Sequence, residues 1–290
     1  MPVTFVLLAL SICAVWLPSI RVGAKFHVPP WFILLFGAIA SGLAQGYLTF
    51  LAVLWIALLG LAGRLAGQPV SIRWQLTFGT TFASLLALAL ALHLLPGFYN
   101  PVLIANAHFS VHAAPYTQYA NFDKAVGGLL LLTFLCRRTR TLAEWRRLLR
   151  NASLPILTTT PIVVGIAIAL RYVEPDFKLP AYTPVFMITN LLFTCVAEEA
   201  FFRGCVQERL ATAIGLGGIG GVIVILISGL LFGLVHYPGG IAYVAVSSVL
   251  GCGCAYSYAI TRRIEAPILT HFALNAVHFI GFTYPRLSNF

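Results

Sequence analysis

Residues 185–203 read VFMITNLLFTCVAEEAFFR, which places two adjacent carboxylates and an arginine at the end of an apolar run. The whole chain has only eight acidic residues, and two of them are Glu198 and Glu199. A charge at the centre of an inserted helix costs about 2.5–3.5 kcal/mol, so an ionisable residue there is a candidate functional site. On an α-helix Glu199 and Arg203 share a face and are expected to pair. Glu198 points about 100° away from Glu199.

The composition around this stretch is that of a membrane protein. The chain is 60% hydrophobic and 9% charged, with a mean hydropathy of +0.92. Apolar runs long enough for spanning helices recur along it, and the alternating segments of a β-barrel are absent from the sequence. We therefore predict an all-α fold, a polytopic membrane helical bundle of about 8–10 transmembrane helices. We expect a multi-pass protein of a cell membrane, the inner membrane of a bacterium.

One uncharged run, from Trp31 to Ala62, is too long for a single upright helix. At 1.5 Å per residue it extends roughly 48 Å. It forms either one tilted helix or a pair of helices that turns near Gln45-Gly46. The pair keeps the basic loops on one side of the membrane, so the positive-inside rule favours it.

We attribute the net charge of +10 to basic loops that set the orientation of the chain in the membrane. Six of the eighteen basic residues lie within residues 137–150, between apolar segments, as the positive-inside rule requires. This stretch is amphipathic and is expected to touch anionic lipid headgroups. No nucleic-acid motif accompanies it, so we expect the lipid bilayer and no nucleic acid as its partner.

A polar connector at residues 172–183 separates two parts of the chain. We predict that residues 1–172 form N-terminal transmembrane helices. Residues 184–283 are then a catalytic helical core.

Two later segments of this core carry polar side chains at a four-residue spacing. Phe232 and His236 lie in the first, and His271 and Asn275 lie in the second. Polar groups within hydrocarbon need partners, and they satisfy one another best when they share a cavity. We therefore expect these side chains to meet the carboxylate of Glu198.

Such a set suits the hydrolysis of an amide. Desolvation raises the pKa of a carboxylate and brings a general base closer to working pH. Glu198 would take a proton from water and His236 would hold that water. His271 and Asn275 would direct donors at one oxyanion, each worth about 3–4 kcal/mol in the transition state.

The supporting role falls to Arg203. It would neutralise Glu199 and leave Glu198 as the carboxylate without an ionic partner.

Three motifs resemble those of the CPBP intramembrane protease family (CAAX proteases and bacteriocin-processing enzymes): Glu198-Glu199-x-x-x-Arg203, Phe232-x-x-x-His236 and His271-x-x-x-Asn275. The resemblance covers residues 184–283 and includes the Ras-converting CAAX prenyl endopeptidases. It implies an intramembrane endopeptidase of the glutamic type whose site lies in a water-filled cavity within the bilayer.

In that family pattern Glu198 activates water beside His236, His271 and Asn275 stabilise the oxyanion, and no cofactor is needed. Glu199 and Arg203 remain as support. The implied partner is a membrane-embedded or lipid-anchored protein or peptide, cut near its C-terminus or at the membrane boundary. Prenylated proteins, sorting tails and peptide toxins all remain open as substrates.

Three alternatives remain open. Glu198, His236 and His271 would form a His2Glu zinc site of a metalloprotease, although the chain lacks the His-Glu-x-x-His spacing. Buried carboxylates and imidazoles also make the proton relays of coupled transporters, but here they gather in the last third of the chain. A non-catalytic immunity protein would keep the shape of the family without its chemistry.

Overall fold

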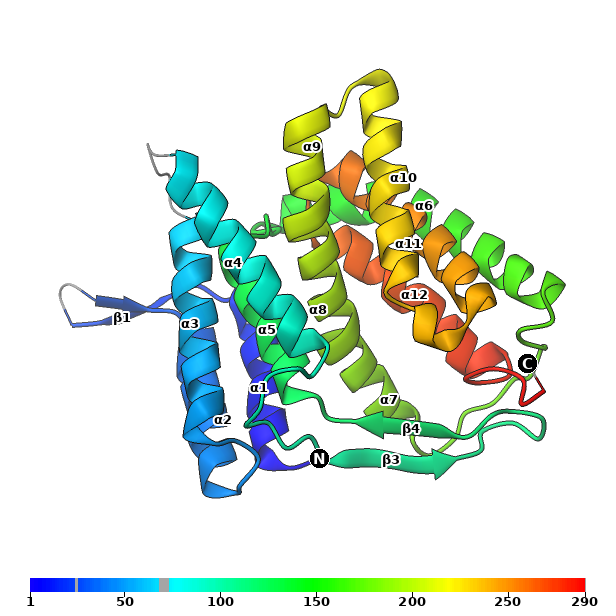
Figure 1. Ribbon diagram of the computed structural model, residues 1–290, viewed down its shortest axis with the longest axis horizontal. Helices are drawn as coiled ribbons and strands as arrows, with labels where there is room; N and C mark the ends of the chain where they lie inside the picture. The colour runs from blue at the N-terminus through cyan, green and yellow to red at the C-terminus, as the bar shows by residue number, and fades with distance from the viewer. Residues whose placement is uncertain (24–25, 68–72, 290) are drawn as a thin grey trace. The chain divides into compact units, whose positions relative to one another are not determined.

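A computed structural model describes residues 1–23, 26–67 and 73–289, which fold mainly into helices (Figure 1). The α-helices are α1 (Val3–Cys13), α2 (Pro30–Ala44), α3 (Phe50–Gly67), α4 (Arg73–Ala91), α5 (Phe122–Phe134), α6 (Leu142–Ala169), α7 (Thr183–Thr189), α8 (Val196–Glu199), α9 (Glu208–Ile214), α10 (Gly218–Leu234), α11 (Ile241–Thr261) and α12 (Glu265–Gly281). Short strands within the described ranges pair as β1 (Ile20–Val22) with β2 (Phe26–Val28) and β3 (Val102–Ala107) with β4 (Tyr116–Tyr119). The all-α prediction is confirmed.

Several of these helices are long and apolar enough to cross a membrane. Among the described residues four runs meet this criterion: Phe50–Gly67, Leu142–Ala169, Thr183–Ile214 and Ile241–Thr261. Shorter apolar helices cover Val3–Trp16, Pro30–Ala44, Thr77–Ala91 and Gly218–Leu234. Large apolar side chains such as Phe50, Leu157 and Ile219 point outward, as lipid-facing residues do. The chain is therefore a polytopic, integral membrane helical protein.

The uncharged run from Trp31 onward is a pair of helices, as the positive-inside argument favoured. The first, α2, ends at Ala44, and α3 begins at Phe50. Gly46 lies in the turn with φ of +76°, a conformation that glycine adopts readily. The turn therefore falls where the sequence predicted it.

Residues 142–150 of the basic stretch and the apolar segment that follows form one helix, α6, and not an amphipathic piece followed by a separate span, whereas residues 137–141 precede the helix. A capping box starts α6, because the Thr141 hydroxyl accepts from the Glu144 backbone and the Glu144 carboxylate accepts from the Thr141 backbone. Pro155 and Pro161 lie inside the helix without ending it. Neighbouring groups can satisfy the carbonyls that such prolines free in a membrane helix.

The chain divides into two compact units. The first comprises Met1–Leu103, Tyr119–Cys136 and Leu192–Phe201. The second comprises Ile104–Gln118, Arg137–Leu191 and Phe202–Phe290. These two units are defined by how compactly the chain packs. The functional division between residues 172 and 184 stays a prediction.

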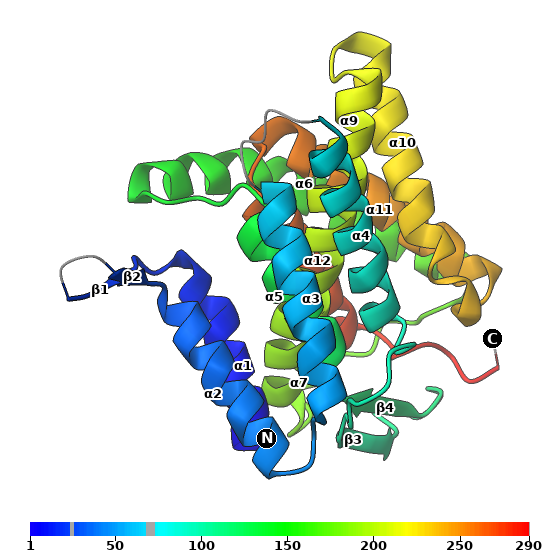
Figure 2. The same cartoon turned by 60° about the vertical axis from the view of Figure 1, so that its left-hand side comes forward.

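In the first unit, α5 is the central helix. Nearly all its residues are buried, and it packs against α1, α3, α4 and α8. Around it, α1 lies beside α2, and α3 lies beside α4 (Figure 2). The apolar run after Lys124 therefore fills the core of this unit.

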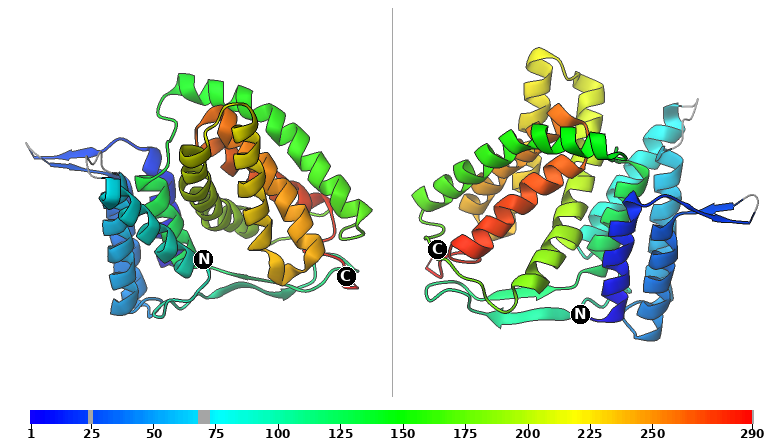
Figure 3. Two further views of the ribbon diagram at one scale, coloured as in Figure 1. Left: turned by 45° about the horizontal axis from the view of Figure 1, so that its top comes forward. Right: turned by 180° about the vertical axis from the view of Figure 1, so that it is seen from behind.

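In the second unit, α10 and α11 pack closely, and α6 lies along α11 and α12 (Figure 3). Small residues allow the close contact of α10 with α11. A Cβ on Gly251 would lie 2.7 Å from the carbonyl oxygen of Gly229, so no larger residue fits without a shift. Small residues at helix interfaces are typical of membrane bundles, where packing replaces the hydrophobic effect between helices.

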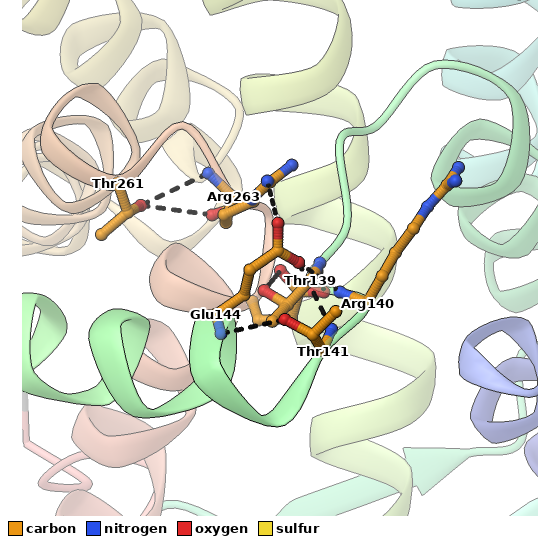
Figure 4. Close-up of polar contacts among 7 residues, drawn as sticks. Thr139, Arg140, Thr141, Glu144, Thr261 and Arg263 are labelled. Carbon is orange, nitrogen blue, oxygen red and sulfur yellow. Dashed lines mark hydrogen bonds and ion pairs between the residues drawn. The ribbon is translucent and has the colours of Figure 1, made fainter.

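Polar contacts join the start of α6 to the link between α11 and α12. Arg263 donates to the Glu144 carboxylate at 2.7 Å (Figure 4). The buried carboxylate of Glu265 accepts from the Thr139 backbone N–H at 2.7 Å and from the Thr139 hydroxyl at 3.1 Å. These contacts hold the first turn of α12, the helix that carries His271 and Asn275.

We expect Glu265→Ala to destabilise the protein, because it leaves the buried Thr139 donors without their carboxylate acceptor. The cost of such a loss is about 1–3 kcal/mol. Arg263→Ala is the matched control, since its ion pair with Glu144 is one-third exposed, such pairs contribute little, and the capping box at Thr141 stays intact. Thermal unfolding in detergent should show the larger drop in Tm for Glu265→Ala. Equal drops would mean that the buried contacts do not hold α12.

Candidate functional site

The helical run Thr183–Ile214 carries the acidic motif and changes its winding twice. Residues Asn190–Cys195 and Ala200–Gln207 are π-helical, and the single α-helical turn Val196–Glu199 lies between them. Both glutamates thus lie in one α-turn with a wider turn on each side. Such π-segments are rare and occur frequently at functional sites.

The π-helical winding after Glu199 contradicts an assumption made from the sequence about the Glu199–Arg203 pair. The expected Glu199–Arg203 pair presumed regular α-helical spacing, but the hydrogen bonds of Ala200–Gln207 close five residues apart. The pair itself therefore stays a prediction.

Glu198 has an ionic partner, contrary to the expectation that its carboxylate would have none. The Lys124 Nζ donates to Glu198 Oε1 at 2.7 Å, and the two side chains are only 18% and 15% exposed. Lys124 is absent from the set of site residues predicted from sequence. The sequence did contain an indication of its role, because Lys124 is a lone cation at the start of an apolar segment, where a charge needs a partner.

Arg203 is fully buried in the second unit and supports Phe232. Its guanidinium donates to the Ser228 hydroxyl at 2.7 Å and lies over the Phe232 ring at 5.6 Å. It also lies 5.9 Å from the centre of the Phe202 ring. A buried cation stacked on aromatic faces is stabilised by the ring quadrupoles.

Phe232 brings the two imidazoles together. Its ring centre lies 4.9 Å from that of His236 and 5.5 Å from that of His271. His271 is buried on α12, whereas His236 is half-buried at the end of α10. The structure thus places His236 and His271 against one aromatic side chain, as a shared site requires.

The tautomer of His236 follows from its hydrogen bond. Its Nδ1 lies 2.7 Å from the Phe232 carbonyl oxygen, which only accepts, so Nδ1 carries the proton. In the neutral imidazole, Nε2 is then the accepting nitrogen. This is the form that accepts a hydrogen bond from water.

Asn275 lies one turn after His271 on α12 and is oriented by Asn190. The Asn275 amide donates to the Asn190 side-chain oxygen at 3.1 Å. Asn190 opens the first π-segment and is also absent from the predicted set. A carboxamide in an apolar run was the sequence signal that pointed to it.

The far end of α12 is tied to the polar connector. The backbone N–H groups of Asp176 and Lys178 donate to the carbonyls of Gly281 and Ile280, each at 2.8 Å. Burial lowers the pKa of Lys178. The helix that presents His271 and Asn275 is therefore fixed at both ends.

The predicted residues fall into two groups by unit. His236, His271 and Asn275 belong to the second unit, and Glu198 and Glu199 belong to the first. Within the part of the chain that the structure describes, no three His, Cys, Asp or Glu side chains form a set that could hold a metal ion.

Comparison with known proteins identifies the domain. Residues 180–277 match the family model of the type II CAAX prenyl endopeptidase Rce1-like proteins. No curated protein and no solved structure matches the chain. The matched range contains all three polar motifs and ends just after Asn275. The chain therefore carries, at residues 180–277, an Rce1-like domain of the CAAX protease family.

Proposed function

We propose that this protein is an intramembrane endopeptidase that cleaves a membrane-associated protein or peptide near its C-terminus or at the membrane boundary. Glu198, His236, His271 and Asn275 carry the reaction. Glu199 and Arg203 support them. The observation that carries the proposal is the Rce1-like match, because one family range includes all these residues.

In the proposed reaction the oxygen of a water molecule attacks the carbonyl carbon of the scissile peptide. Glu198 takes one proton from this water while the carbonyl oxygen becomes an oxyanion. His271 and Asn275 donate to that oxyanion. The C–N bond then breaks and Glu198 returns the proton to the leaving nitrogen. One water is consumed, and a new carboxyl end and a new amine are formed.

The arrangement of the second unit supports these roles. The Nδ1–H form of His236 leaves Nε2 as the nitrogen that accepts from water. Phe232 keeps His236 and His271 on one aromatic ring, and Asn190 orients the Asn275 amide. Such positioning by supporting side chains is what a preorganised oxyanion site needs.

The family match and the apolar helices support a substrate class. The matched proteins are named prenyl endopeptidases, and the helices that carry the present motifs are apolar enough to span a membrane. We infer a substrate held at the membrane by a lipid anchor or its own apolar segment.

The test uses purified full-length protein in lipid vesicles with two fluorogenic C-terminal peptides that differ only in a prenyl group. We expect cleavage, with the new termini located by mass spectrometry, and a preference for the anchored peptide. Absence of cleavage of either peptide, or of any peptide from membrane extracts, would favour a non-catalytic immunity protein. Proton uptake that depends on a transported solute would favour the transporter.

The metal requirement is a separate prediction. We expect a strong chelator to leave kcat unchanged, because in the proposed mechanism the carboxylate of Glu198 activates water without a Lewis acid. Activity is measured after dialysis against chelator, with and without added Zn2+. Loss of activity that Zn2+ restores would instead establish a His2Glu metalloprotease.

A further inference from the structure

The position of Lys124 is unexplained by its own helix. It lies in the first turn of α5, where the helix dipole disfavours a cation. The residues that follow it are apolar and buried. A lysine there is better explained by a partner on another helix than by local structure.

That partner is Glu198. The two side chains meet at 2.7 Å and are both largely shielded from solvent, so solvent screening of the pair is weak. Lys124 Nζ engages Oε1 of the carboxylate. An ammonium fixed on one carboxylate oxygen restricts the rotation of the whole group and aims the other oxygen.

A second network holds Lys124 in place. The buried carboxylate of Asp123 lies 2.6 Å from His93 Nδ1 and accepts from Asn100 at 3.0 Å. It also accepts from the backbone N–H of Lys124 at 2.9 Å. Asn100 in turn accepts from the Phe122 backbone at 2.8 Å. The start of α5 is thus locked to the segment that follows α4.

Close contact of the backbones sets the distance between α5 and α8. A Cβ on Gly128 would lie 2.5 Å from the Cα of Ala197, so only glycine permits this approach. Gly128 follows Lys124 by four residues and therefore shares its face of α5. Ala197 directly precedes Glu198. The lysine is thus held at a fixed distance from the carboxylate.

We propose that Lys124 is the positioning residue of Glu198, holding its carboxylate by Oε1 so that Oε2 takes the proton from water. This inference rests on the proposed function. Lys124 lies outside residues 180–277, so the N-terminal helices supply part of the machinery of the Rce1-like domain.

The experiment compares Lys124→Met, Lys124→Arg and Glu198→Gln in the vesicle assay with the anchored peptide. We expect Lys124→Met to lower kcat at least about tenfold while KM changes less than about threefold, because positioning acts on the chemical step. We expect Lys124→Arg, which keeps the charge, to recover most of kcat. A purely structural ion pair would show neither the kcat–KM split nor the rescue.

Arg262→Met is the matched control, because Arg262 forms an ion pair of the same 2.7 Å length with Glu208 and lies outside the proposed machinery. Its kcat should stay at the wild-type value. Should Lys124→Met fail to fold, Lys124→Leu carries the test, since it also removes both the charge and the donor.

Wild-type kcat in a folded Lys124→Met or Lys124→Leu variant overturns the role of Lys124. If Glu198→Gln also remains active, the proposed role of Glu198 as general base fails as well. If only Glu198→Gln is inactive, the proposed function and the role of Glu198 stand, and the positioning role of Lys124 alone is lost.

Discussion

Replacing Glu198 by glutamine is expected to lower kcat by about 10²–10⁴-fold, the usual contribution of a general base. The substitution keeps the size of the side chain and an oxygen for Lys124, but the amide cannot take a proton from water. KM should change little, because the carboxylate acts on water and not on the bound peptide. Initial rates with the anchored peptide measure both constants.

Glu208→Gln is the control for this variant. Glu208 lies on the same helical run, is partly exposed and pairs with Arg262 at the same distance as Glu198 with Lys124. The loss of the ion pair by itself should therefore affect Glu198→Gln and Glu208→Gln to the same degree. If both variants lose activity to the same degree, helix stability and not general-base chemistry explains the effect.

The second large effect is expected at Asn275. Truncation to alanine removes one proposed oxyanion donor, and such a loss lowers kcat by about 10²–10³-fold. The fold should survive, because the Asn275 side chain is only half-buried. Comparable losses in kcat and in kcat/KM would indicate an interaction made only in the transition state.

Asn190→Ala tests how that donor is held. It removes the acceptor that orients the Asn275 amide and leaves the donor itself, so we expect a smaller fall in kcat. In the double variant, in which Asn190 and Asn275 are both replaced by alanine, Asn190→Ala should lower kcat little beyond the effect of Asn275→Ala alone. The reason is that the two residues act as a unit. Full additivity of the two effects would contradict the positioning role of Asn190.

The hydropathy pattern and the turn-forming residues between apolar segments made much of the fold predictable. The turn predicted at Gln45-Gly46 falls between α2 and α3 in the structure. The unbroken length of α6 was harder to predict. Its basic first part and apolar second part have different compositions, yet the capping box at Thr141 starts one helix that continues through both.

The candidate site was predictable in its motif residues and not in their partners. Four-residue spacings indicate side chains on one helix face, which is how Phe232 and His236 were paired. Lys124 and Asn190 meet Glu198 and Asn275 across gaps of 74 and 85 positions. Contacts between distant segments depend on how helices pack, and a single sequence does not encode that packing in any local pattern.

The π-helical segment Ala200–Gln207 has a consequence for how chains of this kind vary in length. Within it Arg203 reaches Ser228 on α10, and Gln207 donates to the Ala255 carbonyl on α11 at 2.9 Å. Deleting one residue there would favour an ordinary α-helix and turn every later side chain by about 100° around the axis. Such a deletion would hardly change the hydropathy of the segment. It would, however, move Arg203 and Gln207 away from their hydrogen-bond partners on α10 and α11. Gaps in aligned relatives should therefore avoid these eight positions.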